Sequence, residues 1–304
     1  MSVPSEHGPR HGRHPENGPP PDLPPDWPNR SLSRTVHLPP IRWHVQDSGG
    51  SGPVVLLLHG AGASCHSWRD VLPILGRKRR VIAIDLPGQG FSRLAGRDGT
   101  GLDDMARAIG TLIAHEGWHV DALIGHSAGA AVALRLCLDL APPPRAVVGI
   151  NAALGTFEGL SGVLFPLMAR VLAGTSLTAQ VFAATASVSR ARRLLSETGS
   201  TISDAGVAQY LRLMRDPLHV DGTLTMMARW QLEALNARLP GIALPVLFIV
   251  GDADRAVPPT VSRTAARGMP DARVEHLPGL GHLCHEEAPD EVCRRIDAFL
   301  GPPP

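Results

Sequence analysis

The pentapeptide Gly125-His126-Ser127-Ala128-Gly129 constrains the fold of this chain more than any other stretch. It follows a mostly apolar, strand-like run over 120–124 and opens an alanine-rich helical run over 128–140. A serine in so tight a strand-to-helix turn is under backbone strain, and a Cβ two positions before or after it would clash with the neighbouring strand or helix. The pentapeptide therefore predicts a turn that exposes the Ser127 hydroxyl at the carboxyl edge of a sheet. The alternative is a turn rich in glycine and serine with no chemistry.

Composition narrows the class of protein. The chain has 304 residues, of which 43% are hydrophobic, so it can bury the core of one large α/β domain with an insertion or of two smaller domains. With 29 basic and 28 acidic residues it has no electrostatic footprint for nucleic acid. The four cysteines lack metal or disulfide spacing, which favours free thiols in a reducing compartment. We expect a cytoplasmic protein with no signal peptide and no transmembrane segment.

The N-terminal residues 1–25 are crowded with proline, glycine and histidine and contain almost no large apolar side chains. They cannot bury enough surface to offset the entropy of ordering, so we expect a disordered tail. The three histidines of this segment are expected to be solvated and not to bind a metal.

From residue 33 onward, strand-like and helical patterns alternate, which predicts a mostly parallel sheet with helices on both faces. Residues 33–37 and 41–46 are expected to form a leading antiparallel pair. The other predicted strands are 54–58, 81–85, 122–124, 146–150, 246–250 and 274–277, and the predicted helices are 67–75, 102–115, 128–138, 259–267 and 289–300.

The alternation stops between residues 156 and 239. This segment has no strand-like run, but it has helical patterns over 160–172, 179–184, 207–215 and 224–235. We therefore divide the chain into the tail, an α/β core over 26–155 and 240–304, and a helical cap over 156–239 inserted after the sixth strand.

Two late motifs supply partners for Ser127. Gly251-Asp252-Ala253-Asp254 follows one predicted strand, and Gly279-Leu280-Gly281-His282 follows the last. His282 would take the proton of the serine hydroxyl, which is a poor nucleophile unassisted, and an acid would orient the imidazole. Asp254, farther into its loop, is favoured over Asp252 as that acid, and His282 is favoured over His285. A metal site at His282, Cys284 and His285 is disfavoured because no further ligands cluster nearby.

These motifs occur in the order nucleophile, acid, histidine, and from residue 33 to 300 the chain resembles the α/β-hydrolase superfamily. The stretch Asp85-Leu86-Pro87-Gly88-Gln89-Gly90-Phe91-Ser92 also matches a loop of that superfamily. The resemblance implies the α/β-hydrolase fold, with an eight-stranded, mostly parallel sheet and a helical cap. It also implies an oxyanion hole made by the backbone N–H groups of Ala61, in His59-Gly60-Ala61-Gly62, and Ala128.

Within that superfamily the chain is most similar to the magnesium-chelatase accessory proteins of bacteriochlorophyll biosynthesis. The stretches that carry this likeness are residues 26–30 (DWPNR), 42–46 (RWHVQ), 66–70 (HSWRD), 125–130 (GHSAGA), 226–230 (MMARW) and 277–283 (LPGLGHL). The resemblance implies a role around the insertion of Mg²⁺ into protoporphyrin, with magnesium-chelatase subunits as partners and no cofactor of its own. It does not define the biochemical task.

Two hypotheses follow. The first is a serine hydrolase that acts on an ester or related acyl substrate through Ser127, within pigment synthesis or unrelated to it, as an esterase, a carbon–carbon bond hydrolase or a cofactor-free haloperoxidase. The second is a non-catalytic accessory that binds a porphyrin intermediate under an apolar cap. Candidate pocket residues are Trp68, His126, Met226, Met227 and Trp230, and candidate cationic partners of the propionates are Arg170, Arg212, Arg215 and Arg229.

Overall fold

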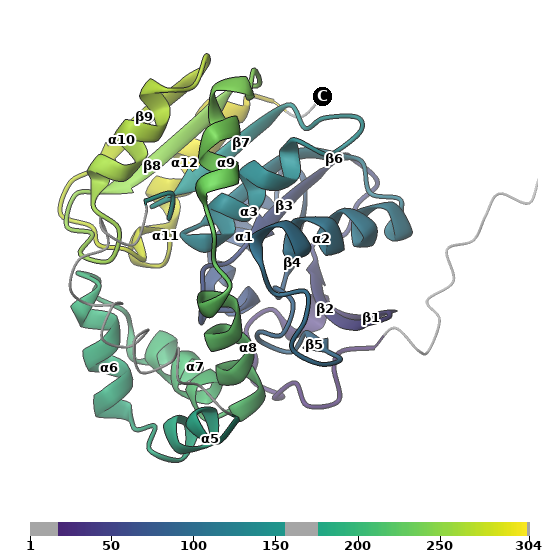
Figure 1. The fold of residues 1–304 in the computed structure, drawn as a ribbon, viewed down its shortest axis with the longest axis vertical. Coiled ribbons are helices and arrows are strands. Elements are labelled where there is room, and N and C mark those ends of the chain that lie inside the picture. Colours follow the sequence, from purple (N-terminus) through teal and green to yellow (C-terminus); the bar gives the residue numbers. More distant parts are fainter. Residues whose placement is uncertain (1–17, 156–175, 303–304) are drawn as a thin grey trace, which may run out of the picture.

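The computed structural model describes residues 18–155 and 176–302, which fold around one sheet (Figure 1). From β3 to β9 the pairings along the sheet are parallel, whereas β1 and β2 form the expected antiparallel pair. The predicted α/β-hydrolase fold is confirmed, and a two-residue strand, β5, joins the eight expected strands in the described part of the chain. Along the sheet the strands lie in the order β1-β2-β4-β3-β6-β7-β8-β9, with β5 beside β2. Their bounds, in chain order, are β1 (Ser33–Leu38), β2 (Ile41–Asp47), β3 (Val54–Leu58), β4 (Arg80–Ile84), β5 (Arg93–Leu94), β6 (Val120–His126), β7 (Ala146–Ile150), β8 (Val246–Gly251) and β9 (Ala272–Leu277).

Helices cover both faces of the sheet, so the central strands β3 and β6 are buried at every residue. One face packs against α2 (Leu102–Glu116), α3 (Ala128–Cys137) and α9 (Glu233–Arg238), and the other against α1 (Val71–Leu75) and α12 (Pro289–Leu300) (Figure 1). Successive residues of β8 show the alternation, since Phe248 joins the first core and Leu247 the second. In place of the single helix expected over 67–75, a short 3₁₀ turn (Cys65–Trp68) precedes α1.

The interval between β7 and β8 is helical in its described part, with α5 (Ser176–Ala184), α6 (Val188–Glu197), α7 (Asp204–Met214), α8 (Pro217–Ala228) and α9. Helices α5 to α8 gather below the sheet in Figure 1. The helix expected over 224–235 is wrong, because α8 ends at Ala228 and α9 begins at Glu233. The helix expected over 160–172 lies outside the described residues. Between β8 and the C-terminus come α10 (Pro259–Arg267), α11 (Cys284–Glu287) and α12.

Helix α8 is in close contact with the loop that follows β4. A Cβ on Gly222 would lie 1.9 Å from the carbonyl oxygen of Gly88, so only glycine allows this approach. The N–H of Gly90 donates to Nδ1 of His219 at 2.9 Å. The Nε2 of Gln89 donates to the sulfur of Met226 at 2.9 Å. These contacts fix α8 to the core beside the predicted oxyanion loop.

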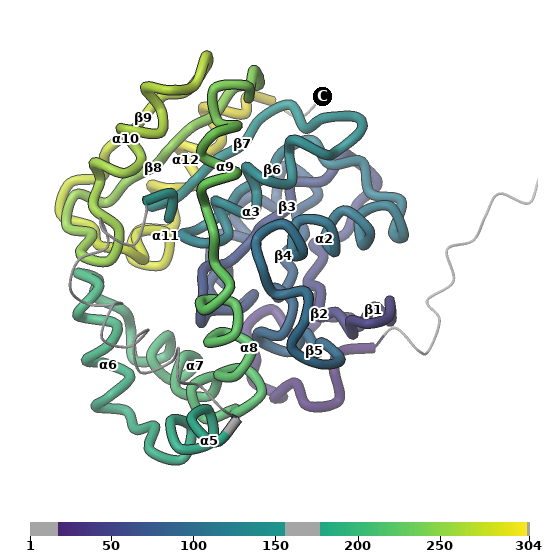
Figure 2. Tube along the Cα trace, in the orientation of Figure 1, coloured from purple at the N-terminus to yellow at the C-terminus, as the bar shows by residue number. Residues whose placement is uncertain are grey.

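Residues 18–32 link the core to the cap, and the purple segment in Figure 2 lies beside α7 and α8. Leu23 and Trp27 are buried against Phe91 of the core and Leu213 of α7. Asp26 accepts two hydrogen bonds from Arg212 of α7, at 2.7 and 2.6 Å. Leu23, near the end of the segment 1–25 that we expected to be disordered, therefore packs against the rest of the protein. Within the described ranges, no helix combines the length and apolar character needed to cross a membrane.

The pH dependence of unfolding tests the packing of His219. Burial lowers the pKa of His219 to about 4, from an ordinary value of 6.5, so the folded state holds the ring neutral while the unfolded state takes up a proton. Stability should therefore fall as the pH falls from 6.5 to about 4, with this residue contributing about 1.4 kcal/mol per pH unit. In His219→Asn, whose amide oxygen can still accept from Gly90, urea unfolding across this window should show a shallower slope by about one proton. The exposed His37→Asn is the control and should keep the wild-type slope; equal slopes in all three proteins would contradict the assignment.

Candidate active site

Ser127 occupies a strained turn between β6 and α3. Its backbone angles are φ 52° and ψ −117°, in a region that a residue other than glycine rarely adopts. Hydrogen bonds hold the strain in place. The N–H of Ser127 donates to the carbonyl oxygen of Ile150 at 2.9 Å, and its carbonyl oxygen accepts from Ala130 and Ala153 at 3.1 Å. The turn is therefore anchored to the end of β7 as well as to its own helix.

The glycines around Ser127 are there because backbone passes where a Cβ would be. A Cβ on Gly125 would lie 2.3 Å from the carbonyl oxygen of Gly129, and one on Gly129 would lie 2.2 Å from that of Leu58. A Cβ on Gly60 would lie 3.1 Å from the Cβ of Ser127. The loop after β3 therefore lies directly beside the serine, as the sequence predicts.

His282 and Asp254 meet at the carboxyl ends of β8 and β9. Nδ1 of His282 donates to Oδ2 of Asp254 at 2.8 Å, and Oδ1 of the same carboxylate accepts the N–H groups of Ala256 and Val257, each at 2.8 Å. These contacts fix the carboxylate. Because Nδ1 of His282 is bonded to Asp254, Nε2 is the ring nitrogen that does not contact the acid. The competing Asp252 is exposed and contacts His276 instead, at 2.6 Å.

The main chain of His282 is held by two residues beneath it. The carbonyl oxygen of His282 accepts from Nδ2 of Asn151 at 2.8 Å and from Nε2 of His126 at 2.9 Å. Oδ1 of Asn151 accepts the N–H of Gly251 at 2.9 Å, so one amide connects the loop of the acid to that of the histidine. Asn151 was not among the predicted site residues, although its place directly after a predicted strand is a usable signal.

Three histidine rings lie next to one another at the site, tilted and not stacked, and their surroundings differ. The His126 ring lies 4.7 Å from that of His282 and 4.4 Å from that of His285. Burial lowers the pKa of His285 to about 3, and burial together with the other two rings lowers the pKa of His126 well below its usual value. Of the three, only His282 contacts a carboxylate, and its side chain is 10% exposed. His285, the competing histidine, lies in α11 and is fully buried, with Nε2 2.8 Å from Oγ of Ser67.

The loop after β3 is fixed by His59. Its Nε2 accepts the N–H of Leu86 at 2.9 Å, so the proton is on Nδ1, which donates to the carbonyl oxygen of Gly60 at 2.8 Å. The N–H of Gly62 donates to Gln89 at 2.9 Å. The N–H of Ala61 has no partner among residues 18–155 and 176–302. Ala128 is the first residue of α3, where an N–H has no acceptor within the helix.

A sequence model of the "Alpha/beta hydrolase family" matches residues 55–295. The chain belongs to the alpha/beta hydrolase family. It is 50% identical over 280 residues to the magnesium-chelatase 30 kDa subunit of Rhodobacter capsulatus, an alignment that spans 91% of this chain and 98% of that protein. It is also 26% identical over 277 residues to a 2-(acetamidomethylene)succinate hydrolase of Mesorhizobium japonicum, spanning 88% and 95% of the two chains.

Solved structures agree on the fold of this alpha/beta hydrolase. An alpha/beta hydrolase fold protein from Burkholderia ambifaria superposes with a TM-score of 0.72 at 22% identity, covering 87% of this chain and 97% of that one. A membrane phospholipase A superposes with a TM-score of 0.74 at 22% identity, covering 90% and 87%. At such identities the likeness concerns the fold alone.

The candidate pocket residues of this alpha/beta hydrolase lie in different surroundings. Trp68 is fully buried with its ring 4.7 Å from that of His285, and His126 is 2% exposed beneath the site. Met226 is buried against Gln89, Met227 is 9% exposed, and Trp230 is half-buried against the core. Their contact with a substrate stays a prediction.

Within the described ranges, three side chains, of His44, Cys65 and Asp85, come close enough to share a metal ion. The carboxylate of Asp85 is already occupied: it accepts from Nδ1 of His44 at 2.8 Å and from the N–H groups of Cys65 and Phe91. Burial raises the pKa of Asp85, but His44, the nearby His59 and the N–H of Phe91 more than offset it and hold that pKa well below its usual range. These residues form a hydrogen-bond network in which the oxygens of Asp85 already have donors, so the carboxylate is not free to bind a metal ion.

The turn at Ser127 can be tested by filling its glycines. Gly129→Ala should lower the free energy of unfolding by about 2 kcal/mol or more, because the new methyl group would collide with the backbone of Leu58. Gly110→Ala on α2 is the matched control: its Cβ would meet only Leu136 at 3.7 Å, and it should stabilise by about 0.5–1 kcal/mol. Urea unfolding of both variants measures the difference, and equal effects would mean that α3 does not lie as described.

Proposed function

We propose that the chain is a magnesium-chelatase accessory protein of bacteriochlorophyll biosynthesis that retains a serine-hydrolase centre of Ser127, His282 and Asp254. The 50% identity to the magnesium-chelatase 30 kDa subunit over almost the full length of both chains supports the accessory role. The hydrolase centre is supported chiefly by the hydrogen bond from His282 to Asp254, made at the sheet edge where the strained turn presents Ser127.

In the proposed reaction Oγ of Ser127 attacks the carbonyl carbon of an ester or related acyl substrate. Nε2 of His282 takes the hydroxyl proton, and Asp254 orients the imidazole and stabilises the imidazolium. The tetrahedral oxyanion is bound by the N–H groups of Ala61 and Ala128, each contributing roughly 3–4 kcal/mol to transition-state stabilisation. His282 then protonates the leaving group, and water activated by the same ring releases the acyl group from Ser127.

His126 and Asn151 would act as positioning residues in this scheme, because they hold the carbonyl oxygen of His282 and touch no reacting atom. The role of His126 suits its lowered pKa, since a neutral ring donates through Nε2 without adding a charge beside the imidazolium.

A fluorophosphonate probe tests the hydrolase centre. The wild-type protein should be labelled at Ser127, Ser127→Ala should abolish labelling, and Asp254→Asn should slow it by about 10³-fold or more because the imidazole loses its orienting acceptor. Asp252→Asn is the matched control, since this exposed acid in the same loop should leave the rate unchanged. Failure of the folded wild-type protein to react, with Ser127→Ala indistinguishable from it, would contradict the hydrolase centre.

A second candidate function is a non-catalytic accessory that binds a porphyrin intermediate, which the name of the Rhodobacter capsulatus relative favours because it describes a chelatase subunit. Complementation separates the two. If turnover is the task, Ser127→Ala should fail to restore pigment in a strain that lacks the gene, while Asp252→Asn should restore it. Full restoration by Ser127→Ala, with the variant protein present at wild-type levels, would favour the non-catalytic role.

A further inference from the structure

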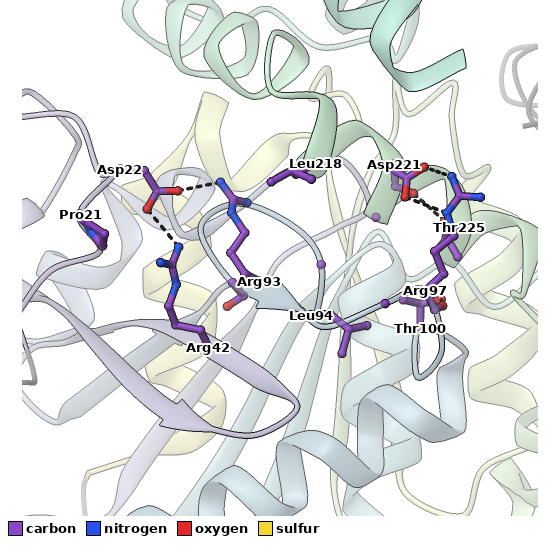
Figure 3. A pocket seen from close by; sticks show the side chains of 14 residues that line it. Pro21, Asp22, Arg42, Arg93, Leu94, Arg97, Thr100, Leu218, Asp221 and Thr225 are labelled. Atoms are coloured by element: carbon purple, nitrogen blue, oxygen red, sulfur yellow. Dashed lines mark hydrogen bonds and ion pairs between the residues drawn. The ribbon is translucent and has the colours of Figure 1, made fainter. Parts of the chain in front are cut away.

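A cavity of about 750 Å³ lies away from Ser127, between the N-terminal segment, the loops around β5 and helix α8 (Figure 3). None of Ser127, Asp254, His282, Ala61 and Ala128 lines it. Its volume is within the range of pockets that enclose small molecules. Neither the family nor the proposed hydrolase chemistry gives it a task.

The cavity has arginine side chains at both ends. At one end Asp22 of the N-terminal segment accepts from Arg42 at 3.2 Å and from Arg93 at 2.9 Å. At the other end Arg97 pairs with Asp221 of α8. In Figure 3 the group of Asp22, Arg42 and Arg93 lies at one end and the pair of Arg97 and Asp221 lies at the other. At both ends the arginine side chains point toward carboxylates.

Apolar side chains separate the two ends. Leu94 and Leu218 lie between them in Figure 3, and Leu218 is 64% exposed although it is a large aliphatic residue. The exposed Leu218 side chain offers contact area to an apolar ligand.

The carboxylates now in place are held in partly exposed ion pairs, Asp22 with Arg42 and Arg93 and Asp221 with Arg97. Asp22 is 39% exposed and Arg42 28%, and ion pairs in such surroundings contribute little to stability. Guanidinium groups match carboxylates in a two-pronged geometry, so an incoming carboxylate could take the place of Asp22. Arg93 would keep its second partner, Asp216, at 2.8 Å, and Arg42 would be left without one among the described residues.

We propose that this cavity binds an elongated amphipathic dicarboxylate, a small molecule whose two carboxylates are separated by an apolar skeleton. One carboxylate binds Arg42 and Arg93 in place of Asp22, the other binds Arg97 in place of Asp221, and the skeleton covers Leu94 and Leu218. Asp22 therefore acts as a tethered competitor for the first position.

The cavity is joined to the loop beside the candidate active site. Gly88 and Gly222, whose backbones are in close contact, both line the cavity. The next residue, Gln89, accepts the N–H of Gly62 and donates to Met226. A bound ligand would thus rest on the segment that holds the loop after β3.

Calorimetric titration at low salt tests the site with a series of linear diacids: suberate, sebacate, dodecanedioate and hexadecanedioate. At least one should bind saturably with one site per chain, and its monomethyl ester should bind at least about tenfold more weakly because one arginine end is unused. Arg42→Ala and Arg97→Ala should each cost a similar factor, while the control Arg135→Ala, ion-paired on the far helix α3, should bind as wild type. Absence of saturable binding across the series, or equal binding by diacid and monoester, would overturn the proposal.

A second variant reports even if the arginine variants fold poorly. Asp22→Asn removes the competing charge and keeps the shape of the side chain, so it should tighten diacid binding several-fold while the circular dichroism of the protein stays unchanged. Unchanged or weakened affinity in this folded variant would overturn the displacement of Asp22 and with it the proposed mode of binding.

Discussion

The close approach of helix α3 to strands β3 and β6 is the constraint on which the site depends. Gly129 brings α3 to van der Waals contact with the backbone of Leu58, and Gly125 lets the helix start immediately after the strand. Ser127 can then keep a positive φ because its N–H donates to the end of β7 and its carbonyl oxygen accepts from Ala130 and Ala153. Without that contact the serine would relax into an ordinary turn, and the loop after β3 would no longer lie beside it.

Much of this could be predicted from the sequence because the signals are local. Apolar runs such as residues 146–150 coincide with strands, and Asp254 and His282 are found where their glycine-rich turns place them. The cap was harder. The apolar spacing of Met226, Met227 and Leu235 continues across the turn that separates α8 from α9, so periodicity alone reads one helix where the chain makes two. The start of α8 had a signal that was not used, since Asp216 caps the helix ahead of Pro217.

Other parts of the site depend on contacts between residues far apart in the chain, which no local pattern encodes. The cap segment that follows α6 is an example: the carbonyl oxygen of Thr198 accepts the N–H of Arg255 at 3.1 Å, and Oγ of Ser200 accepts that of Leu283 at 2.8 Å. The cap therefore touches the loops of both the acid and the histidine. If the acid loop and the histidine loop moved apart, at least one of these hydrogen bonds to the cap would be strained or broken.

A buried polar network makes the same connection through side chains. Glu286 follows His285 in α11, and its carboxylate accepts from Ser67 and from Tyr210 of α7, each at 2.6 Å, while Arg69 pairs with it. Burial raises the pKa of Glu286, and Arg69 and these donors oppose the rise. Moving α7 away from the core would remove the hydrogen bond that Tyr210 donates to this buried carboxylate, which is costly because a buried acceptor would lose a partner. The cap of this protein is consequently tied to the core at the histidine loop, at α8 and at the N-terminal segment.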